Sequence, residues 1–281
     1  MENTFDMEQY LNNSKKISIS DLDFSRAKDF PISAEEIRCL TYMMDIESHT
    51  MIYLRGLLGT CAVRDPEVGA FLSCWVYEEF FHGRVLRQFL EAAGFPVDNA
   101  RPDDVRKNRS WREKGEEVAA ALLCRVVSDF QALYLVWGAV QELSTLEGYG
   151  VLARRTQNPV LRDLLLRIIK DERRHFSFYF NKARLRLRSK STQRVTLWIL
   201  NRFWTPVGHG VKDTSEVQWT MRYIFGRAEG LQVARRIDSI ISRLPGLDGF
   251  SLLTHARQRA MQESTEEVWY YLPTHDDRRA G

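Results

Sequence analysis

The chain has 281 residues, of which 44% are hydrophobic and 27% are charged, as in an ordinary globular protein. Its 40 basic and 37 acidic residues leave a formal net charge of +3, which is too small to indicate a nucleic-acid-binding protein. The longest uninterrupted apolar stretch, Ala132 to Val140, is much shorter than the roughly 20 residues of a transmembrane helix, so no membrane span is predicted.

Residues 1–30 are predicted to form a polar, irregular leader. The segment from Met1 to Asn13 is acidic and polar and lacks the basic start and apolar run of a secretory signal. The four cysteines lie in apolar periodic segments without a Cys-x-x-Cys pair, as buried free thiols do; they are Cys39, Cys61, Cys74 and Cys124. We therefore expect a protein of the reducing cytoplasm that is soluble, or at most peripheral to a membrane.

A first helical hairpin is predicted from local start and stop signals. Ser33 and Glu36 form a capping box that begins a helix running to about Gly59. Asp65, followed by a proline, begins a second helix, which Gly94 ends together with the proline after it. The connection between these helices is short, so they should pack antiparallel.

A second hairpin follows a long polar segment. Residues 95–115 are charged and proline-containing, and are long enough to cross from one end of a bundle to the other. A third periodic stretch runs to about Arg155, and Asn158 with the proline after it begins a fourth helix that extends to about Arg188. Two hairpins joined by one long crossover predict an all-α, ferritin-like four-helix bundle.

The chain is thus divided into a leader (1–30), a helical bundle (31–190) and a C-terminal extension (191–281). The extension contains further helical patterns around residues 192–203, 215–225 and 229–244, with prolines as breaks between them. We expect these helices to pack on the side or end of the bundle.

Six acidic and imidazole side chains recur in the same order in both hairpins. Each hairpin has a lone glutamate on its first helix and a Glu-x-x-His motif on its second, at nearly equal separations. The residues are Glu47, Glu79 and His82 in the first hairpin, and Glu142, Glu172 and His175 in the second. Residues at i and i+3 share one helical face, so each motif presents a carboxylate and an imidazole together.

These glutamates share helical stripes with apolar residues. Glu47, for example, aligns with Leu40, Met44 and Met51. Four carboxylates in a core require protons or cations, because one unpaired buried carboxylate costs several kcal/mol. Two divalent metals would cancel the four charges, and mixed carboxylate and imidazole ligands suit iron, or else manganese. The sequence therefore predicts a di-iron centre.

Two alternatives concern individual residues. A single Glu-x-x-His motif is more typical of a solvated helix surface, and only its duplication favours a metal site. Glu147 rivals Glu142 as a ligand, but on an ideal helix it points about 140° away from it. Glu142 is therefore preferred.

Three motifs resemble those of the soluble acyl-acyl-carrier-protein desaturases. They are Glu-Glu-x-x-His-Gly at 78–83, Gln-Glu-x-x-Thr at 141–145 and Asp-Glu-Arg-Arg-His at 171–175, and the resemblance covers about residues 35–185. It implies two iron ions on the six residues, O2 as co-substrate, and desaturation of an acyl chain on acyl carrier protein. It further implies a ferredoxin-type electron donor and a homodimer.

The resemblance also assigns roles to residues beside the metals. Thr145 matches a threonine that assists oxygen activation. Asp171 is expected to hydrogen-bond the second ring nitrogen of His82, and Glu78 that of His175, although Glu78 is equally well explained as surface charge.

Other readings remain open. The basic run at residues 184–194 suits an acidic carrier protein but equally suits a solvated helix face. The same metal site could serve a di-iron oxygenase that hydroxylates another small molecule or oxidises an amine. It could also serve a ferritin-like protein that oxidises or stores iron, which would assemble into a large cage.

Overall fold

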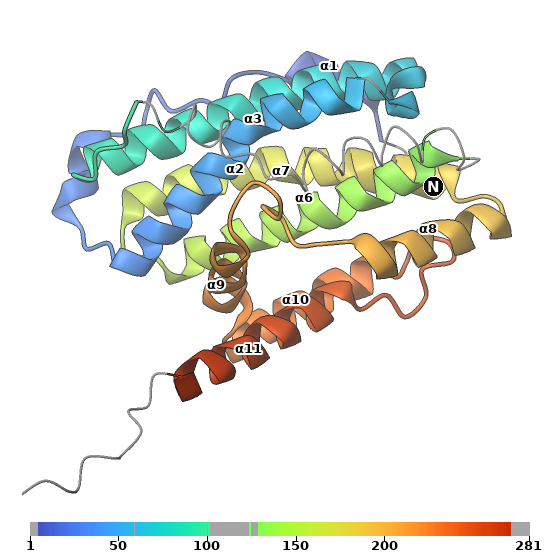
Figure 1. The fold of residues 1–281 in the computed structure, drawn as a ribbon. Coiled ribbons are helices and arrows are strands. Elements are labelled where there is room, and N and C mark those ends of the chain that lie inside the picture. The colour runs from blue at the N-terminus through green and yellow to red at the C-terminus, as the bar shows by residue number, and fades with distance from the viewer. Residues whose placement is uncertain (1–4, 59, 100, 102–123, 125–128, 271–281) are drawn as a thin grey trace, which may run out of the picture.

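The computed structural model describes residues 5–58, 60–99, 101, 124 and 129–270, and helices dominate it (Figure 1). No strand forms among these residues, which confirms the predicted all-helical class. The helices are α1 (Met7–Asn13), η1 (Phe24–Asp29), α2 (Ala34–Leu58), η2 (Cys61–Arg64), α3 (Pro66–Ala92), α6 (Phe130–Arg155), α7 (Pro159–Arg186), α8 (Lys190–Phe203), α9 (Thr214–Phe225), α10 (Ala228–Ile241) and α11 (Leu252–Tyr270).

The predicted helix starts are confirmed by their capping hydrogen bonds. The Ser33 amide donates to Glu36 Oε2 (2.9 Å) and the Glu36 amide donates to Ser33 Oγ (3.1 Å), which begins α2. The side chains of Asp65 and Asn158 accept amide hydrogen bonds at the starts of α3 and α7. Most of the predicted crossover at 95–115, and the beginning of the third periodic stretch, lie outside the described residues.

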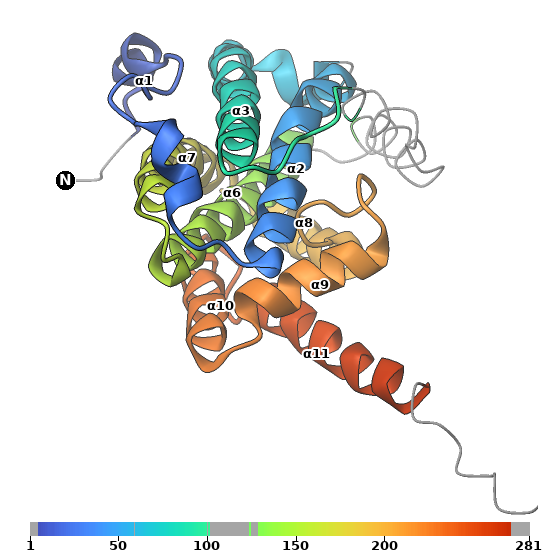
Figure 2. The ribbon, with the colours of Figure 1, turned by 90° about the vertical axis from the view of Figure 1, so that its left-hand side faces the viewer.

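The long helices pack in two pairs. α2 lies beside α3, and α6 lies beside α7, while α3 also contacts α7 (Figures 1 and 2). The C-terminal helices cover one side of these pairs: α8, α9 and α10 contact α6, and α9 also contacts α2. No described helix has both the length and the apolar character to cross a membrane. The finer assignment to the ferritin-like bundles stays a prediction.

Four of the described elements were not predicted from the sequence, namely α1, η1, η2 and α11. The leader contains α1 and η1, which pack on α3, and it buries Tyr10 against Phe71, with ring centroids 5.1 Å apart. Such short segments carry too few apolar residues to show a helical period. α11 was missed as well, although Leu253, Ala256 and Ala260 are buried on one of its faces.

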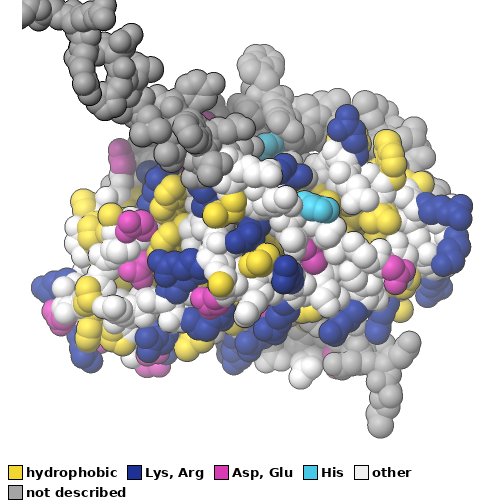
Figure 3. Space-filling model, turned by 90° about the horizontal axis from the view of Figure 1, so that it is seen from below, with side chains coloured by type: hydrophobic (Ala, Val, Ile, Leu, Met, Phe, Trp, Pro, Cys, Tyr) yellow, Lys and Arg dark blue, Asp and Glu magenta, His cyan; other side chains and the backbone are white. Residues whose placement is uncertain are grey.

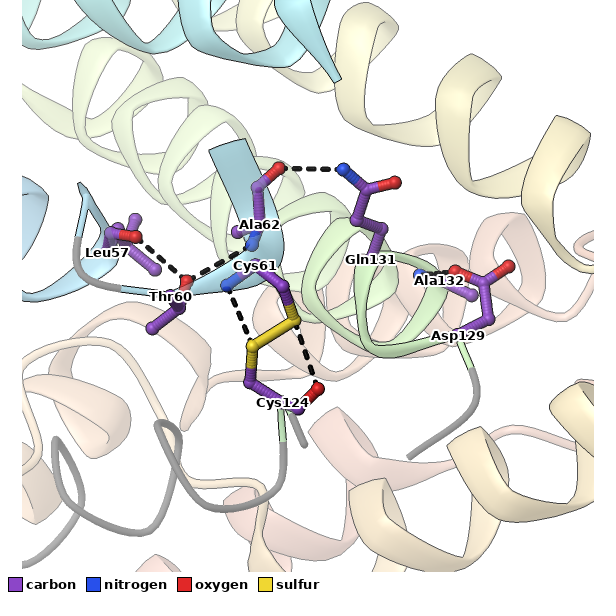
Figure 4. The surroundings of a disulfide bond; sticks show 8 residues. All are labelled: Leu57, Thr60, Cys61, Ala62, Cys124, Asp129, Gln131 and Ala132. Carbon is purple, nitrogen blue, oxygen red and sulfur yellow. Dashed lines mark hydrogen bonds between the residues drawn. A yellow bond between two sulfur atoms is a disulfide. The ribbon is translucent and has the colours of Figure 1, made fainter. Parts of the chain in front are cut away.

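The cysteines correct one prediction. Cys61 on η2 and Cys124 form a disulfide, with Cα atoms 5.8 Å apart, whereas Cys39 and Cys74 are free thiols (Figure 4). The expectation of four free thiols was therefore wrong for this pair. A separation of 63 residues in the sequence concealed their proximity in the fold. Because disulfides are rare in cytosolic proteins, the pairing removes the thiol-based reason for expecting a reducing cytoplasm.

Gly138 on α6 allows α7 to approach closely. A methyl group at this position would overlap the ring of Tyr179, which is buried and packs edge to face on Phe71 with centroids 5.1 Å apart. We expect Gly138→Ala to lower the free energy of unfolding by about 1–3 kcal/mol, because this ring cannot move aside. Chemical denaturation measures the change.

Gly69→Ala on α3 is the matched control. The nearest atom to a Cβ at Gly69 is 4.0 Å away, so this variant should be as stable as the wild type, or up to about 1 kcal/mol more stable because alanine favours helix. Equal stability of the two variants would contradict close packing at Gly138.

Candidate metal centre

Four helices bring the six predicted ligands to one buried point. Glu47 comes from α2, Glu142 from α6, and the two Glu-x-x-His motifs come from α3 and α7. All six residues are at most 7% exposed. They form two overlapping groups, in each of which one ligand atom per residue lies within 4.8 Å of the others. One group is Glu47, Glu79, His82 and Glu172, and the other is Glu79, Glu142, Glu172 and His175.

The two histidines present the same ring nitrogen to this cluster. His82 Nδ1 lies 3.3 Å from Glu172 Oε1 and 3.7 Å from Glu47 Oε2. His175 Nδ1 lies 3.0 Å from Glu79 Oε1 and 3.6 Å from Glu142 Oε2. Each imidazole therefore stands at the centre of one of the two groups.

The other ring nitrogen of each histidine meets a carboxylate outside the cluster. His82 Nε2 lies 3.2 Å from Asp171 Oδ2, and His175 Nε2 lies 2.7 Å from Glu78 Oε2. Arg174 joins the two carboxylates, because its guanidinium lies 2.6 Å from Glu78 and 2.9 Å from Asp171. Such partners fix the ring orientation and leave Nδ1 directed at the cluster.

Two tyrosines extend the site beyond the residues expected from sequence. The Tyr149 hydroxyl donates to Glu47 Oε1, and the Tyr10 hydroxyl donates to Glu78 Oε2 at 3.0 Å. Tyr149 follows Glu142 by seven residues and so shares its face of α6, a spacing that could have identified it. Nothing in the local sequence could have identified Tyr10, because its contact depends on how the leader packs.

Burial and neighbouring charges give the carboxylates of the cluster different pKa values. Burial, with the charges of Glu47 and Glu172, raises the pKa of Glu79 well above its usual range, and burial raises the pKa of Glu142 to about 8. Burial acts in the same direction on Glu172, but the charges of the neighbouring His175 and His82 rings help to outweigh it, and this pKa falls to about 2. Without metal, the cluster therefore holds protons on some of its carboxylates.

Several buried ligand atoms have no hydrogen-bond partner. They are Glu47 Oε2, His82 Nδ1, both carboxylate oxygens of Glu172, and His175 Nδ1. Buried polar atoms are almost always paired, and these atoms all face one another, so bound cations would satisfy them together. The donors are carboxylates and imidazoles without thiolate, which fits iron or manganese better than structural zinc. The residues thus fit a metal pair; their assignment as ligands stays a prediction.

The remaining predicted residues lie on α6 around Glu142. Glu147 lies outside both groups and faces Arg236 of α10, with a carboxylate oxygen 3.5 Å from its Nε. Thr145, one turn after Glu142, is half-buried and lines a cavity of about 40 Å³ between α6 and the C-terminal helices. The other lining residues are mainly apolar and include Met43, Val217, Met221, Ile224 and Phe225.

Comparison with known protein families and curated proteins identifies no relative of this chain. No protein-family model matches the chain, and no curated protein matches its sequence. The likeness to the desaturases therefore depends on the three sequence motifs alone.

Proposed function

We propose that this chain is an oxygen-dependent di-iron oxidase built on a ferritin-like bundle. One observation carries the proposal: Glu79 and Glu172 belong to both four-residue groups. Each group also contains one histidine and one glutamate that the other group lacks. Two shared carboxylates with two histidines are the ligand arrangement of di-iron carboxylate proteins.

The chain's own residues would hold the metals in a symmetric way. Glu47 and His82 would bind one ion, and Glu142 and His175 would bind the other. Glu79 and Glu172 would be ligands of both ions. When bound, an iron pair supplies the redox chemistry by which O2 oxidises an unactivated carbon. Burial of all six ligands keeps bulk water away from that chemistry.

The cavity beside Thr145 is the proposed substrate site. At about 40 Å³ it is about three times the volume that one water molecule requires by the same measure, and is too small for a long chain. Met43 and Met221 line it, and their unbranched side chains can rearrange to admit an apolar ligand. Thr145 lines this cavity one turn after Glu142 on α6, and its Oγ1 can hold or transfer a proton there.

The resemblance favours an acyl chain carried on acyl carrier protein as the substrate and a ferredoxin-type protein as the electron donor. The test incubates iron-loaded protein with O2, a ferredoxin reducing system and a panel of acyl carrier proteins, and measures the acyl products by mass spectrometry. Loss of two hydrogens supports desaturation, and gain of one oxygen atom indicates hydroxylation. An iron pair that reacts with O2 but alters no acyl chain would overturn the acyl substrate.

A Thr145→Val variant separates the threonine hydroxyl from its volume. We expect it to bind iron like the wild type but to turn over at least about 100-fold more slowly, the usual loss when a positioned proton donor is removed. Thr145→Ser keeps the hydroxyl and should retain most of the activity. Metal analysis and product formation measure both variants, and full activity of the valine variant would exclude a role for the hydroxyl.

A further inference from the structure

A long segment around α8 carries charge of a single sign. The forty residues 173–212 contain ten Lys or Arg and no Asp or Glu. Some of these cations meet acids from other segments, namely Arg174, Lys182, Arg186 and Lys212. By contrast, Arg188, Lys190, Arg194 and Arg202 are exposed and pair with no carboxylate in the described part of the chain.

α8 also exposes large apolar side chains. Its inner face is buried through Thr196, Ile199 and Leu200. Trp198 on its outer side is 63% exposed, Phe203 at its C-terminal end is 55% exposed, and their rings meet edge to face with centroids 6.1 Å apart. Contiguous exposed apolar side chains mark interaction sites, whereas single ones are common on any protein surface.

The apolar and cationic residues share one surface, which we call the α8 outer face. It comprises Lys190, Arg194, Val195, Trp198, Arg202 and Phe203, all exposed. Helical spacing places Arg194 and Arg202 on either side of Trp198, and the ring of Phe203, the last residue of the helix, lies against Trp198. Figure 3 shows that Lys and Arg prevail over Asp and Glu on the side of the molecule that carries the C-terminal helices.

The positive charge of this face favours an anionic surface over a second copy of the chain as its partner. A twofold contact with a second copy would bring the face against itself and oppose like charges, so it is disfavoured. An anionic surface satisfies the cations instead. Aromatic rings flanked by Arg and Lys along a surface helix are typical of helices that lie at the headgroup level of an anionic bilayer, where the rings insert and the cations meet phosphate.

We propose that the α8 outer face binds peripherally to anionic membranes, with Trp198 and Phe203 inserted at the headgroup level. α8 is followed directly by Trp204, Pro206 and Val207, which line the cavity beside Thr145. Membrane binding therefore places a wall of this cavity close to the bilayer. The proposal is independent of the metal centre and of the acyl substrate.

Co-sedimentation of the full chain with vesicles tests this binding. The wild type should bind vesicles of phosphatidylcholine with phosphatidylserine but not pure phosphatidylcholine, and binding should fall between 0.1 M and 1 M salt as the screening length drops from roughly 10 to 3 Å. Trp198→Ser with Phe203→Ser should weaken binding at least about tenfold. Arg194→Gln with Arg202→Gln should weaken it about 25-fold, at about fivefold for each cation.

Lys15→Gln with Arg84→Gln is the matched control. It changes the net charge equally, but Arg84 is on α3 and Lys15 is in the leader, both remote from α8 (Figure 1), so it should bind like the wild type. All substituted residues are exposed, and thermal melts verify folding.

Three outcomes would overturn the proposal. They are no binding to anionic vesicles, binding that the α8 variants leave unchanged, and an equal loss in the control, which would indicate unspecific charge attraction. If vesicles do not bind but acyl carrier protein does, and the α8 variants abolish that binding, then the face recognises an acidic protein and the membrane proposal is wrong.

Discussion

A Glu172→Ala variant is expected to lose both metal ions, whereas His82→Ala should lose one. Glu172 belongs to both four-residue groups, so its removal takes a ligand from each ion, but His82 belongs to one group alone. Removing Glu172 also leaves His82 Nδ1 without its nearest carboxylate, at 3.3 Å. Iron analysis after loading and desalting should give about two equivalents for the wild type, about one for His82→Ala and close to none for Glu172→Ala.

Glu147→Gln is the control for this series. It removes a carboxylate from the same helix as Glu142 but outside both groups, so the iron content should stay at the wild-type value. Circular dichroism establishes that each variant keeps its helices. A Glu172→Ala protein that is folded and still binds iron like the wild type would show that the two groups do not share this ligand.

Local signals explain why the four long helices could be predicted. The caps at Ser33, Asp65 and Asn158 depend on side chains within three residues of the helix start, and the structure contains all of them. Glu-x-x-His spacing likewise depends only on the helical period. The six predicted ligands are brought together because that period, repeated in two hairpins, directs them to the same interior.

Contacts between distant segments explain what could not be predicted. Tyr10 reaches Glu78 across 68 residues, and Cys61 meets Cys124 across 63, so no local pattern reports either contact. Tyr149 is different, because its position on the Glu142 face was visible. From the sequence, however, Tyr149 is indistinguishable from an ordinary core aromatic residue. Only the structure shows that its hydroxyl donates a hydrogen bond to Glu47. Tertiary packing therefore determines the residues that orient the ligands.

Metal binding is expected to strengthen steeply as pH rises. Burial opposes the charged form of both histidines, but carboxylates outweigh it, so the pKa values of His82 and His175 lie well above their usual range. Both imidazoles are thus protonated at neutral pH without metal, and each must lose its proton before Nδ1 can bind an ion. Apparent affinity should rise about tenfold per pH unit for each proton displaced, and weaken by the same factor as pH falls.

Calorimetry in two buffers of different ionisation enthalpy counts these protons directly. Manganese titrated into the wild type under anaerobic conditions should release at least one proton per ion. Asp171→Asn removes the carboxylate that contributes most to raising the pKa of His82, so this variant should release fewer protons. It should also bind manganese about 10- to 100-fold more weakly, because the His82 ring loses the partner that orients it. Affinity that does not change with pH would mean that the histidines are already neutral, and that the carboxylates around them are themselves protonated in the metal-free protein.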